Sequence, residues 1–150
     1  MIRLHQGIAS CLGIGYIKGG GTIAAIVSGV VWFLLQPDGA FHNEMLIVTG
    51  VVIITGTWSA TIVDPVWGKD SSKVVIDEVA GMCITLLFIP VTWQYLLTGL
   101  VLFRFFDIVK PGYIRKSEAL PAGWGVMADD ILAGIYSNIL LQLIVHFTVK

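Results

Sequence analysis

Charged residues are scarce in this sequence of 150 residues. Asp, Glu, Lys and Arg together make up 13% of the chain, whereas hydrophobic residues make up 56%. A soluble globular domain usually carries about 25% charged residues. The shortage argues against an ordinary soluble domain, and it predicts an integral membrane protein with little room for a separate soluble part.

Other shortages exclude further classes. No basic run with interleaved aromatic residues is present, which argues against nucleic-acid binding. The only cysteines, Cys11 and Cys83, lie in apolar stretches without the spacing of metal ligands, so we expect no disulfide. No Ser-His-Asp or Gly-x-Ser-x-Gly arrangement stands out, and a histidine phosphoenzyme is not indicated. The N-terminal apolar run lacks a small-residue cleavage site, so we expect it to be retained.

The sequence does contain a series of apolar segments divided by polar turns. Five segments are expected to cross the membrane, at residues 22–35, 45–63, 74–89, 95–109 and 127–149. Residues 1–16 are too short to span and are expected to form an interfacial or re-entrant helix. Turns and loops are expected at 36–43, 64–73, 90–93 and 110–126, with Asp70-Ser71-Ser72 capping the helix that follows. The prediction is a single all-α membrane domain over residues 1–150.

Basic residues mark one membrane face. If the loops alternate between faces, the first face receives Lys18, Lys69, Lys73, Lys110, Arg115 and Lys116, with Arg104 one to two turns inside it. The second face receives only Lys150, at the end of the chain. The positive-inside rule therefore predicts that the first face is cytoplasmic.

Acidic residues gather on the same face. Asp77 and Glu78 begin the third expected span, Asp107 ends the fourth, and Asp129 and Asp130 begin the fifth, whereas Asp38 and Glu44 lie on the far side. Five carboxylates from three helices are thus predicted at one depth, where acids are costly. Two glycines, Gly81 and Gly134, each follow an acid by four residues and are expected to let neighbouring helices approach closely.

Clustered carboxylates of this kind are suited to a hard cation such as Mg²⁺. The neighbouring Lys and Arg side chains indicate a phosphate as the partner of the metal. A structural explanation remains open, in which the acids cap helix starts or form surface ion pairs that contribute about 0–1 kcal/mol each. The glycine-rich run Lys18-Gly-Gly-Gly-Thr22 is consistent with either a phosphate-binding loop or a hinge.

Three blocks of the sequence resemble the phosphatidylglycerophosphatase A family. They are Asp70-Ser-Ser-Lys-Val-Val-Ile-Asp77-Glu78-Val-Ala-Gly81, Phe103-Arg104-Phe-Phe-Asp107-Ile-Val-Lys110-Pro111 and Gly125-Val-Met-Ala-Asp129-Asp130-Ile-Leu-Ala-Gly134. Their order and spacing match, and the resemblance covers essentially the whole chain. The family usually has Pro-Gly-Thr in the glycine-rich loop, where this chain has Lys18-Gly-Gly-Gly-Thr22.

The resemblance implies a Mg²⁺-dependent lipid phosphatase of the bacterial inner membrane, which hydrolyses phosphatidylglycerophosphate to phosphatidylglycerol and phosphate. We expect one or two Mg²⁺ ions and the catalytic groups at Asp77, Glu78, Asp107, Asp129 and Asp130. The substrate phosphate would be bound by Arg104, Lys110 and Arg115, with Lys18 and Thr22 from the glycine-rich loop.

Alternatives from other classes stay open on the residues alone. A small cation transporter or channel could use the same acidic cluster. A lipid-alcohol phosphotransferase would also place aspartates at a membrane face, but its Asp-Gly-x-x-Ala-Arg run is absent. A non-catalytic membrane scaffold is the third alternative.

Overall fold

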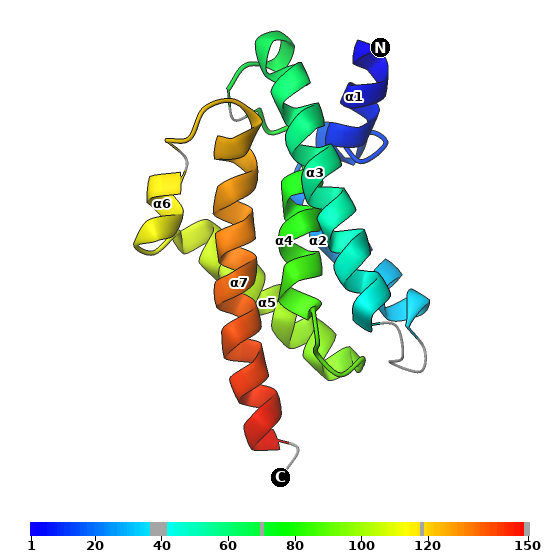
Figure 1. Ribbon diagram of the computed structural model, residues 1–150, viewed down its shortest axis with the longest axis vertical. Helices are drawn as coiled ribbons and strands as arrows, with labels where there is room; N and C mark the ends of the chain where they lie inside the picture. The colour runs from blue at the N-terminus through cyan, green and yellow to red at the C-terminus, as the bar shows by residue number, and fades with distance from the viewer. Residues whose placement is uncertain (37–41, 70, 118, 149–150) are drawn as a thin grey trace.

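The computed structural model describes residues 1–36, 42–69, 71–117 and 119–148. Figure 1 shows a bundle of helices with the two chain ends at opposite ends of the molecule. The elements are α1 (Ile2–Ala9), the short 3₁₀ helix η1 (Ile14–Tyr16), α2 (Gly20–Leu35), α3 (His42–Trp67), α4 (Ile76–Leu86), α5 (Trp93–Val109), α6 (Tyr113–Ser117) and α7 (Gly123–Thr148). No strand occurs in these ranges, which confirms the all-helical prediction.

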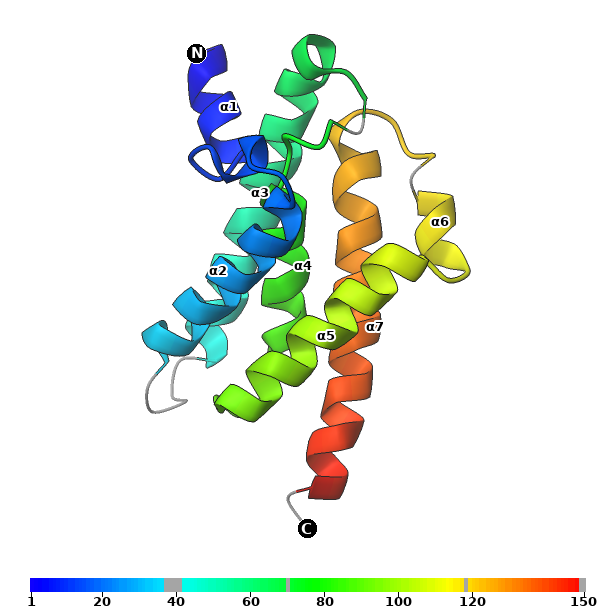
Figure 2. The same ribbon diagram turned by 180° about the vertical axis from the view of Figure 1, so that it is seen from behind.

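Helix α4 lies at the centre of the bundle. It contacts α2, α3, α5 and α7, and both views show it enclosed between these helices (Figures 1 and 2). Nine of its eleven residues are buried. Small residues such as Ala80 and Gly81 allow this enclosure, because they let neighbouring backbones approach. The central helix therefore carries the first two acids of the cluster into the middle of the bundle.

Helix α3 is longer than predicted. We expected the second span to end at Val63 and a loop to begin at Asp64-Pro65, but the helix continues through Pro65 to Trp67. Gly68 ends it instead, in a left-handed conformation with φ +86°, and the Gly68 amide donates to the Asp64 carbonyl at 2.9 Å. A glycine of this kind is a common helix stop. The extra turn packs Trp67 against a core cluster that includes Val63 and Ala9 of the first helix.

The segment before α4 also differs from the prediction. Helix α4 begins at Ile76 rather than Val74, and its N-cap is Val75. Among the described residues no side chain caps it, so the predicted capping by Ser71 and Ser72 was wrong. The Ser71 carbonyl instead accepts from the Val74 amide at 2.9 Å, which makes a turn. The Val75 amide donates to the Ala9 carbonyl at 2.8 Å and ties this turn to α1. Asp70 lies outside the described residues, as do most of the expected 36–43 turn, Asp38 and Lys150.

Two further segments differ from the predicted boundaries. The loop expected at 110–126 contains α6, and α7 begins at Gly123 rather than Met127. The N-terminal segment predicted at 1–16 contains α1 and η1, and its eight-residue α1 is far too short to span a bilayer. It packs along the upper part of α3, where His5 Nδ1 and Ser59 Oγ are 3.1 Å apart.

Two helices are long and apolar enough to cross a membrane, judged by length and composition: residues Asn43–Trp67 within α3 and Gly123–Thr148 of α7. Helix α2 is apolar but shorter. Helix α4 ends at Leu86 rather than at the predicted Ile89. It is only eleven residues long, which is about 16 Å of helix.

The early end of α4 is stabilised by a side chain from α7. Asn138 Nδ2 donates to the carbonyl oxygens of Thr85 and Leu87, at 3.0 and 2.8 Å. Carbonyl groups at a helix end have no intrahelical partner, and they are costly to leave unpaired in an apolar environment. Asn138 therefore fixes the length of the central helix.

We expect Asn138→Leu to destabilise the folded protein by about 1–3 kcal/mol, because two backbone acceptors lose their donor. Thermal unfolding in detergent would measure this. Gln142→Leu is the matched control, since its exposed amide donates only to the Asn138 side chain, at 2.7 Å. Equal stability of both variants would contradict this role for Asn138.

Candidate active site

The site begins where α4 and α7 cross at two glycines. A Cβ placed on Gly134 would lie 2.5 Å from the Gly81 carbonyl oxygen, and one on Gly81 would lie 2.7 Å from the Asp130 carbonyl oxygen. No side chain fits between the two backbones, as the spacing of acids and glycines predicted. The close approach sets Asp77 of α4, one turn above Gly81, beside Asp130 of α7.

Three carboxylates meet at this crossing. Asp77, Glu78 and Asp130 each offer an oxygen that lies within 4.8 Å of the other two. Asp77 and Asp130 are buried, with 9% and 3% of their surface exposed, and Glu78 is half-buried. Like charges at this separation repel strongly in a low-dielectric interior unless a cation or a shared proton lies between them.

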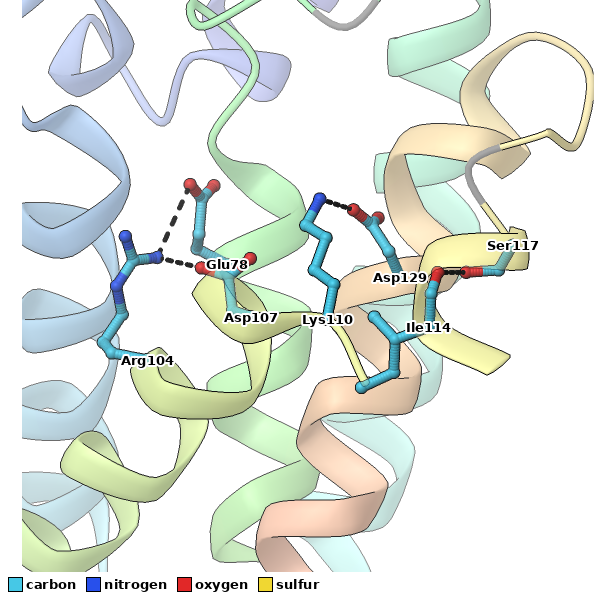
Figure 3. Close-up of polar contacts among 7 residues, drawn as sticks. All are labelled: Glu78, Arg104, Asp107, Lys110, Ile114, Ser117 and Asp129. Atoms are coloured by element: carbon cyan, nitrogen blue, oxygen red, sulfur yellow. Dashed lines mark hydrogen bonds and ion pairs between the residues drawn. The ribbon is translucent and has the colours of Figure 1, made fainter. Parts of the chain in front are cut away.

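The other two acids of the predicted cluster pair with basic side chains, as Figure 3 shows. Arg104 donates to Asp107 Oδ2 at 2.5 Å, and Lys110 donates to Asp129 Oδ2 at 2.6 Å. The Arg104 guanidinium also lies 4.0 Å from Glu78 Oε1. The five acids therefore divide into a group of three at the helix crossing and two that orient basic groups beside it.

All five acids line one cavity of about 250 Å³, together with Lys110, Ser71, Ser72, Val74 and Val126. We call this the carboxylate cavity. The prediction that these acids lie together on one side of the bundle is confirmed at the level of position. Their catalytic and metal-binding roles stay predictions.

Unpaired oxygen atoms show that the carboxylate cavity suits a cation. Asp77 Oδ1, Glu78 Oε2, Asp129 Oδ1 and Asp130 Oδ2 are buried and accept no hydrogen bond from any residue that the structure describes. Buried polar atoms are normally satisfied, and unsatisfied charged ones cost the most. An all-oxygen donor set of this kind fits Mg²⁺, Mn²⁺ or Ca²⁺ better than zinc. The residues present therefore fit a hard divalent cation.

A second cavity adjoins the first. It has a volume of about 580 Å³ and is lined by residues 15–22, Ser72, Lys73, Val74, Glu78 and Arg104. We call it the glycine-rich cavity, because Gly15, Gly19, Gly20 and Gly21 form one wall. The predicted phosphate-binding residues Lys18 and Thr22 lie here and are exposed. Ser72, Val74 and Glu78 line both cavities, so the two are adjacent.

Gly21 makes room for Glu78. A Cβ on Gly21 would lie 1.9 Å from Glu78 Oε1, which is far inside contact distance. The loop therefore determines where the Glu78 carboxylate can sit.

We expect Gly21→Ala to displace the Glu78 side chain and to lower activity, because a displaced ligand misplaces the reacting groups. The fold should hold, since a flexible side chain can move aside. Gly7→Ala is the matched control, as a Cβ there meets nothing within 4 Å. Kinetic measurements on both variants would test this, and full activity of Gly21→Ala would contradict it.

Lys110 has an unusual backbone. It follows the last residue of α5 in the left-handed region, with φ +47° and ψ +59°, and its amide donates to the Phe106 carbonyl at 2.8 Å. Non-glycine residues seldom adopt this conformation, and Pro111 next in the chain prevents the helix from continuing. The turn brings the Lys110 side chain back toward Asp129 of α7, as Figure 3 shows.

One predicted phosphate ligand lies elsewhere, and one cavity residue was missed. Arg115 is exposed on the short helix α6 and lines neither cavity. Lys73, which the sequence analysis placed only on the cytoplasmic face, lines the glycine-rich cavity with its ammonium 5.7 Å from the ring centres of Tyr16 and Trp67. Its position four residues before Asp77 could have indicated from the sequence that it lies near the site.

Comparisons with known proteins agree with the resemblance. The family model described as phosphatidylglycerophosphatase A matches residues 7–145. A Bacteroides thetaiotaomicron protein named "Putative phosphatidylinositol-3-phosphatase" is 39% identical, over 82% of this chain and 81% of its own length. Proteins named phosphatidylglycerophosphatase A from Haemophilus influenzae and Escherichia coli K12 are 36% and 32% identical, over 85% and 84% of this chain and 77% and 74% of their own lengths.

No solved structure matches the chain significantly. The family model covers nearly the whole sequence, including every residue that lines the two cavities. The order of the three acidic blocks, their meeting at the helix crossing and the extent of this match lead to one conclusion: the chain belongs to the phosphatidylglycerophosphatase A family.

Proposed function

We propose that this protein is a Mg²⁺-dependent phosphatidylglycerophosphatase, which hydrolyses phosphatidylglycerophosphate to phosphatidylglycerol and inorganic phosphate. The observation that carries the proposal is the group of Asp77, Glu78 and Asp130, whose buried oxygens lack partners beside the basic groups of Arg104 and Lys110. A divalent cation supplies the positive charge that the three carboxylates lack, and together with the neighbouring basic groups it can hold an anionic phosphate.

Family membership makes the chain a lipid phosphatase, a phosphoric monoester hydrolase. A second substrate remains a candidate because one relative is named for phosphatidylinositol 3-phosphate. Both lipids carry a phosphate monoester on an alcohol that is joined to the lipid through a phosphodiester. The same site could therefore reach either monoester.

The five acids would divide the work of the reaction. Asp77, Glu78 and Asp130 would hold Mg²⁺, with Asp107 and Asp129 completing the site. A bound Mg²⁺ supplies polarisation of the phosphoryl group and neutralisation of its charge. A carboxylate not committed to the cation would accept a proton from the attacking water.

Basic groups would balance the charge on the phosphoryl oxygens. Lys110 and Arg104 are held in fixed positions by Asp129 and Asp107, so little reorganisation is needed as charge shifts in the transition state. Lys18 and Thr22 would contact substrate phosphate from the glycine-rich cavity. Arg115, exposed on α6, would act as an outer basic group that attracts the anionic headgroup.

The membrane arrangement is part of the proposal. Five spans would comprise α2, α3, α4 with the residues up to Pro90, α5 and α7, all within one domain. The outer faces of these helices expose large apolar side chains such as Val30, Ile54, Val101 and Ile139, which suits lipid and not water. The basic loops beside the site would lie on the cytoplasmic face of the inner membrane.

A cation transporter uses acids along a path across the membrane. Here the five acids line one cavity together with Ser71, Ser72 and Lys110. The phosphatase is the better account because it also uses the basic groups that pair with these acids.

The test is phosphate release by purified protein in mixed micelles, with and without Mg²⁺. We expect release from phosphatidylglycerophosphate that requires Mg²⁺ and is unaffected in Glu44→Gln, whose acid is exposed at the start of α3. Phosphatidylinositol 3-phosphate should be assayed in parallel. Folded protein that releases no phosphate from either lipid with any divalent cation would overturn the proposal, and labelled-cation uptake into liposomes would then test the transporter.

A further inference from the structure

We propose that the groove between α2 and α5 holds an acyl chain of the substrate, and that the glycine-rich cavity holds the phosphodiester of the same lipid. This inference rests on the proposed function and adds a path for the whole substrate. It assigns separate places to the part of the lipid that is cleaved and the part that is only held.

The groove is an apolar channel on the outside of the bundle. It has a volume of about 420 Å³ and is lined by Leu100, Val101, Phe105, Ile108 and Val109 of α5, together with Thr22 and Arg104. Figure 2 shows α2 and α5 separating toward the end of the bundle where the site lies, with α4 visible between them. Val101, Phe105 and Ile108 are exposed, so the channel is open along its length.

Shared residues connect the groove to the site. Thr22 and Arg104 line both the groove and the glycine-rich cavity, and Glu78 lines both the glycine-rich cavity and the carboxylate cavity. The three spaces therefore lie next to one another, with these side chains at their boundaries. The groove is apolar, the glycine-rich cavity next to it is basic, and the carboxylate cavity beyond that is acidic and contains the candidate cation site.

This order is the order of chemical groups in the lipid. Phosphatidylglycerophosphate runs from acyl chains through a phosphodiester and a glycerol to the terminal phosphate monoester. Lys18, Lys73 and Arg104 line the middle space, where the diester would lie, and the Arg104 guanidinium also reaches Asp107 and Glu78 toward the monoester. The monoester then reaches the carboxylate cavity and Lys110. A basic group at the head of an apolar groove fits an anionic lipid better than it fits a neutral apolar surface of another protein.

A second apolar cavity offers the comparison. It has a volume of about 250 Å³ and lies between α2, α3 and α4, lined by residues such as Val31, Met45 and Val48. It shares no lining residue with the glycine-rich cavity or the carboxylate cavity. A chain placed there would not be continuous with a headgroup in the site, so the groove between α2 and α5 is the better candidate.

The test uses a matched pair of substitutions and a matched pair of substrates. Val101→Trp fills the proposed groove, and Val31→Trp places the same change at an exposed position in the other apolar cavity. The substrates are diacyl phosphatidylglycerophosphate and its water-soluble deacylated analogue. Both carry the same monoester and diester, so only the acyl chains distinguish them.

We expect Val101→Trp to raise KM for the diacyl lipid severalfold, because the indole removes the packing contacts that the groove makes with the acyl chain. Its kcat/KM for the deacylated analogue should stay within about twofold of wild type. Val31→Trp should change neither. An unchanged KM for the diacyl lipid in Val101→Trp would overturn the inference, and so would an equal rise with both substrates. A wild-type protein inactive on both substrates would instead overturn the proposed function.

Photo-crosslinking shows where the acyl chain of the lipid binds, without requiring turnover. Asp130→Asn protein is irradiated with the diacyl lipid carrying a diazirine in one acyl chain, and adducts are mapped by mass spectrometry. We expect labels on residues 100–109, and fewer of them in the Asp130→Asn, Val101→Trp double variant. Adducts spread over all outward faces would mean bulk lipid only, and cross-links between two chains near Val101 would mean that a second copy covers the groove. Either result would overturn the inference.

Discussion

Asp130→Asn should abolish both activity and cation binding while making the cation-free protein more stable. Asp130 supplies one of the three clustered carboxylates and is 3% exposed. Loss of a metal ligand removes several kcal/mol of transition-state stabilisation. We therefore expect activity to fall about 10³-fold or more. The neutral amide also relieves repulsion within the cluster, so thermal unfolding without Mg²⁺ should move to a higher temperature.

The effect of Mg²⁺ on thermal unfolding should distinguish the wild-type protein from Asp130→Asn. Mg²⁺ should raise the unfolding temperature of the wild-type protein, increasingly so as its concentration exceeds Kd, and it should have little effect on Asp130→Asn. Glu44→Gln is the control because it removes an exposed acid in the first turn of α3. Full activity in Asp130→Asn, or an equal Mg²⁺ response in both proteins, would reject the candidate cation site.

Gly134→Ala should both destabilise the fold and lower activity. The new Cβ would lie 2.5 Å from the Gly81 carbonyl oxygen and 3.1 Å from its Cα. These are backbone atoms that cannot rotate aside, so α4 and α7 must separate. Overpacking of this kind costs about 1–3 kcal/mol. Separation also moves Asp130 away from Asp77 and Glu78, so activity should fall further than stability explains.

Gly50→Ala is the matched control. It makes the same chemical change in the interior of α3, where a Cβ would meet nothing within 4 Å. Alanine favours a helix by about 0.5–1 kcal/mol over glycine, so this variant should be slightly more stable and fully active. Thermal unfolding and phosphate release for both variants would measure the difference. A Gly134→Ala protein that behaves like Gly50→Ala would contradict the close crossing.

The order of helices and the gathering of the acids followed from simple patterns. Apolar length and turn residues predicted the segments, and the spacing of Asp77 with Gly81 and of Asp130 with Gly134 predicted the crossing. The ends of the helices were less predictable because they depend on tertiary contacts. Helix α3 continues through Pro65 to Trp67, which packs against the core cluster shared with α1, and two carbonyl groups at the early end of α4 accept hydrogen bonds from Asn138.

The spacing of the acids in the sequence could not predict which carboxylates form ion pairs and which meet at the helix crossing. Which carboxylate pairs with a cation depends on the turn at Lys110, whose left-handed backbone is rare for a lysine. The place of Lys73 depends on how the loop before α4 packs against α1 and η1, including a close approach of Gly15 to the Lys73 carbonyl. Arg115 looked equivalent to Lys110 in the sequence, but the added helix α6 carries it away from the cavities.

The short, enclosed α4 bears on how the chain enters its membrane. An eleven-residue segment with two acids in its first turn is too short for a bilayer core of about 30 Å, and each acid adds an unfavourable contribution to insertion. We infer that α4 does not insert as an independent unit. The tight connection from Leu86 to Trp93 would let it enter with α5 as a helical hairpin, and the flanking helices would then enclose it. Assembly of the candidate site would thus be one of the last steps of biogenesis.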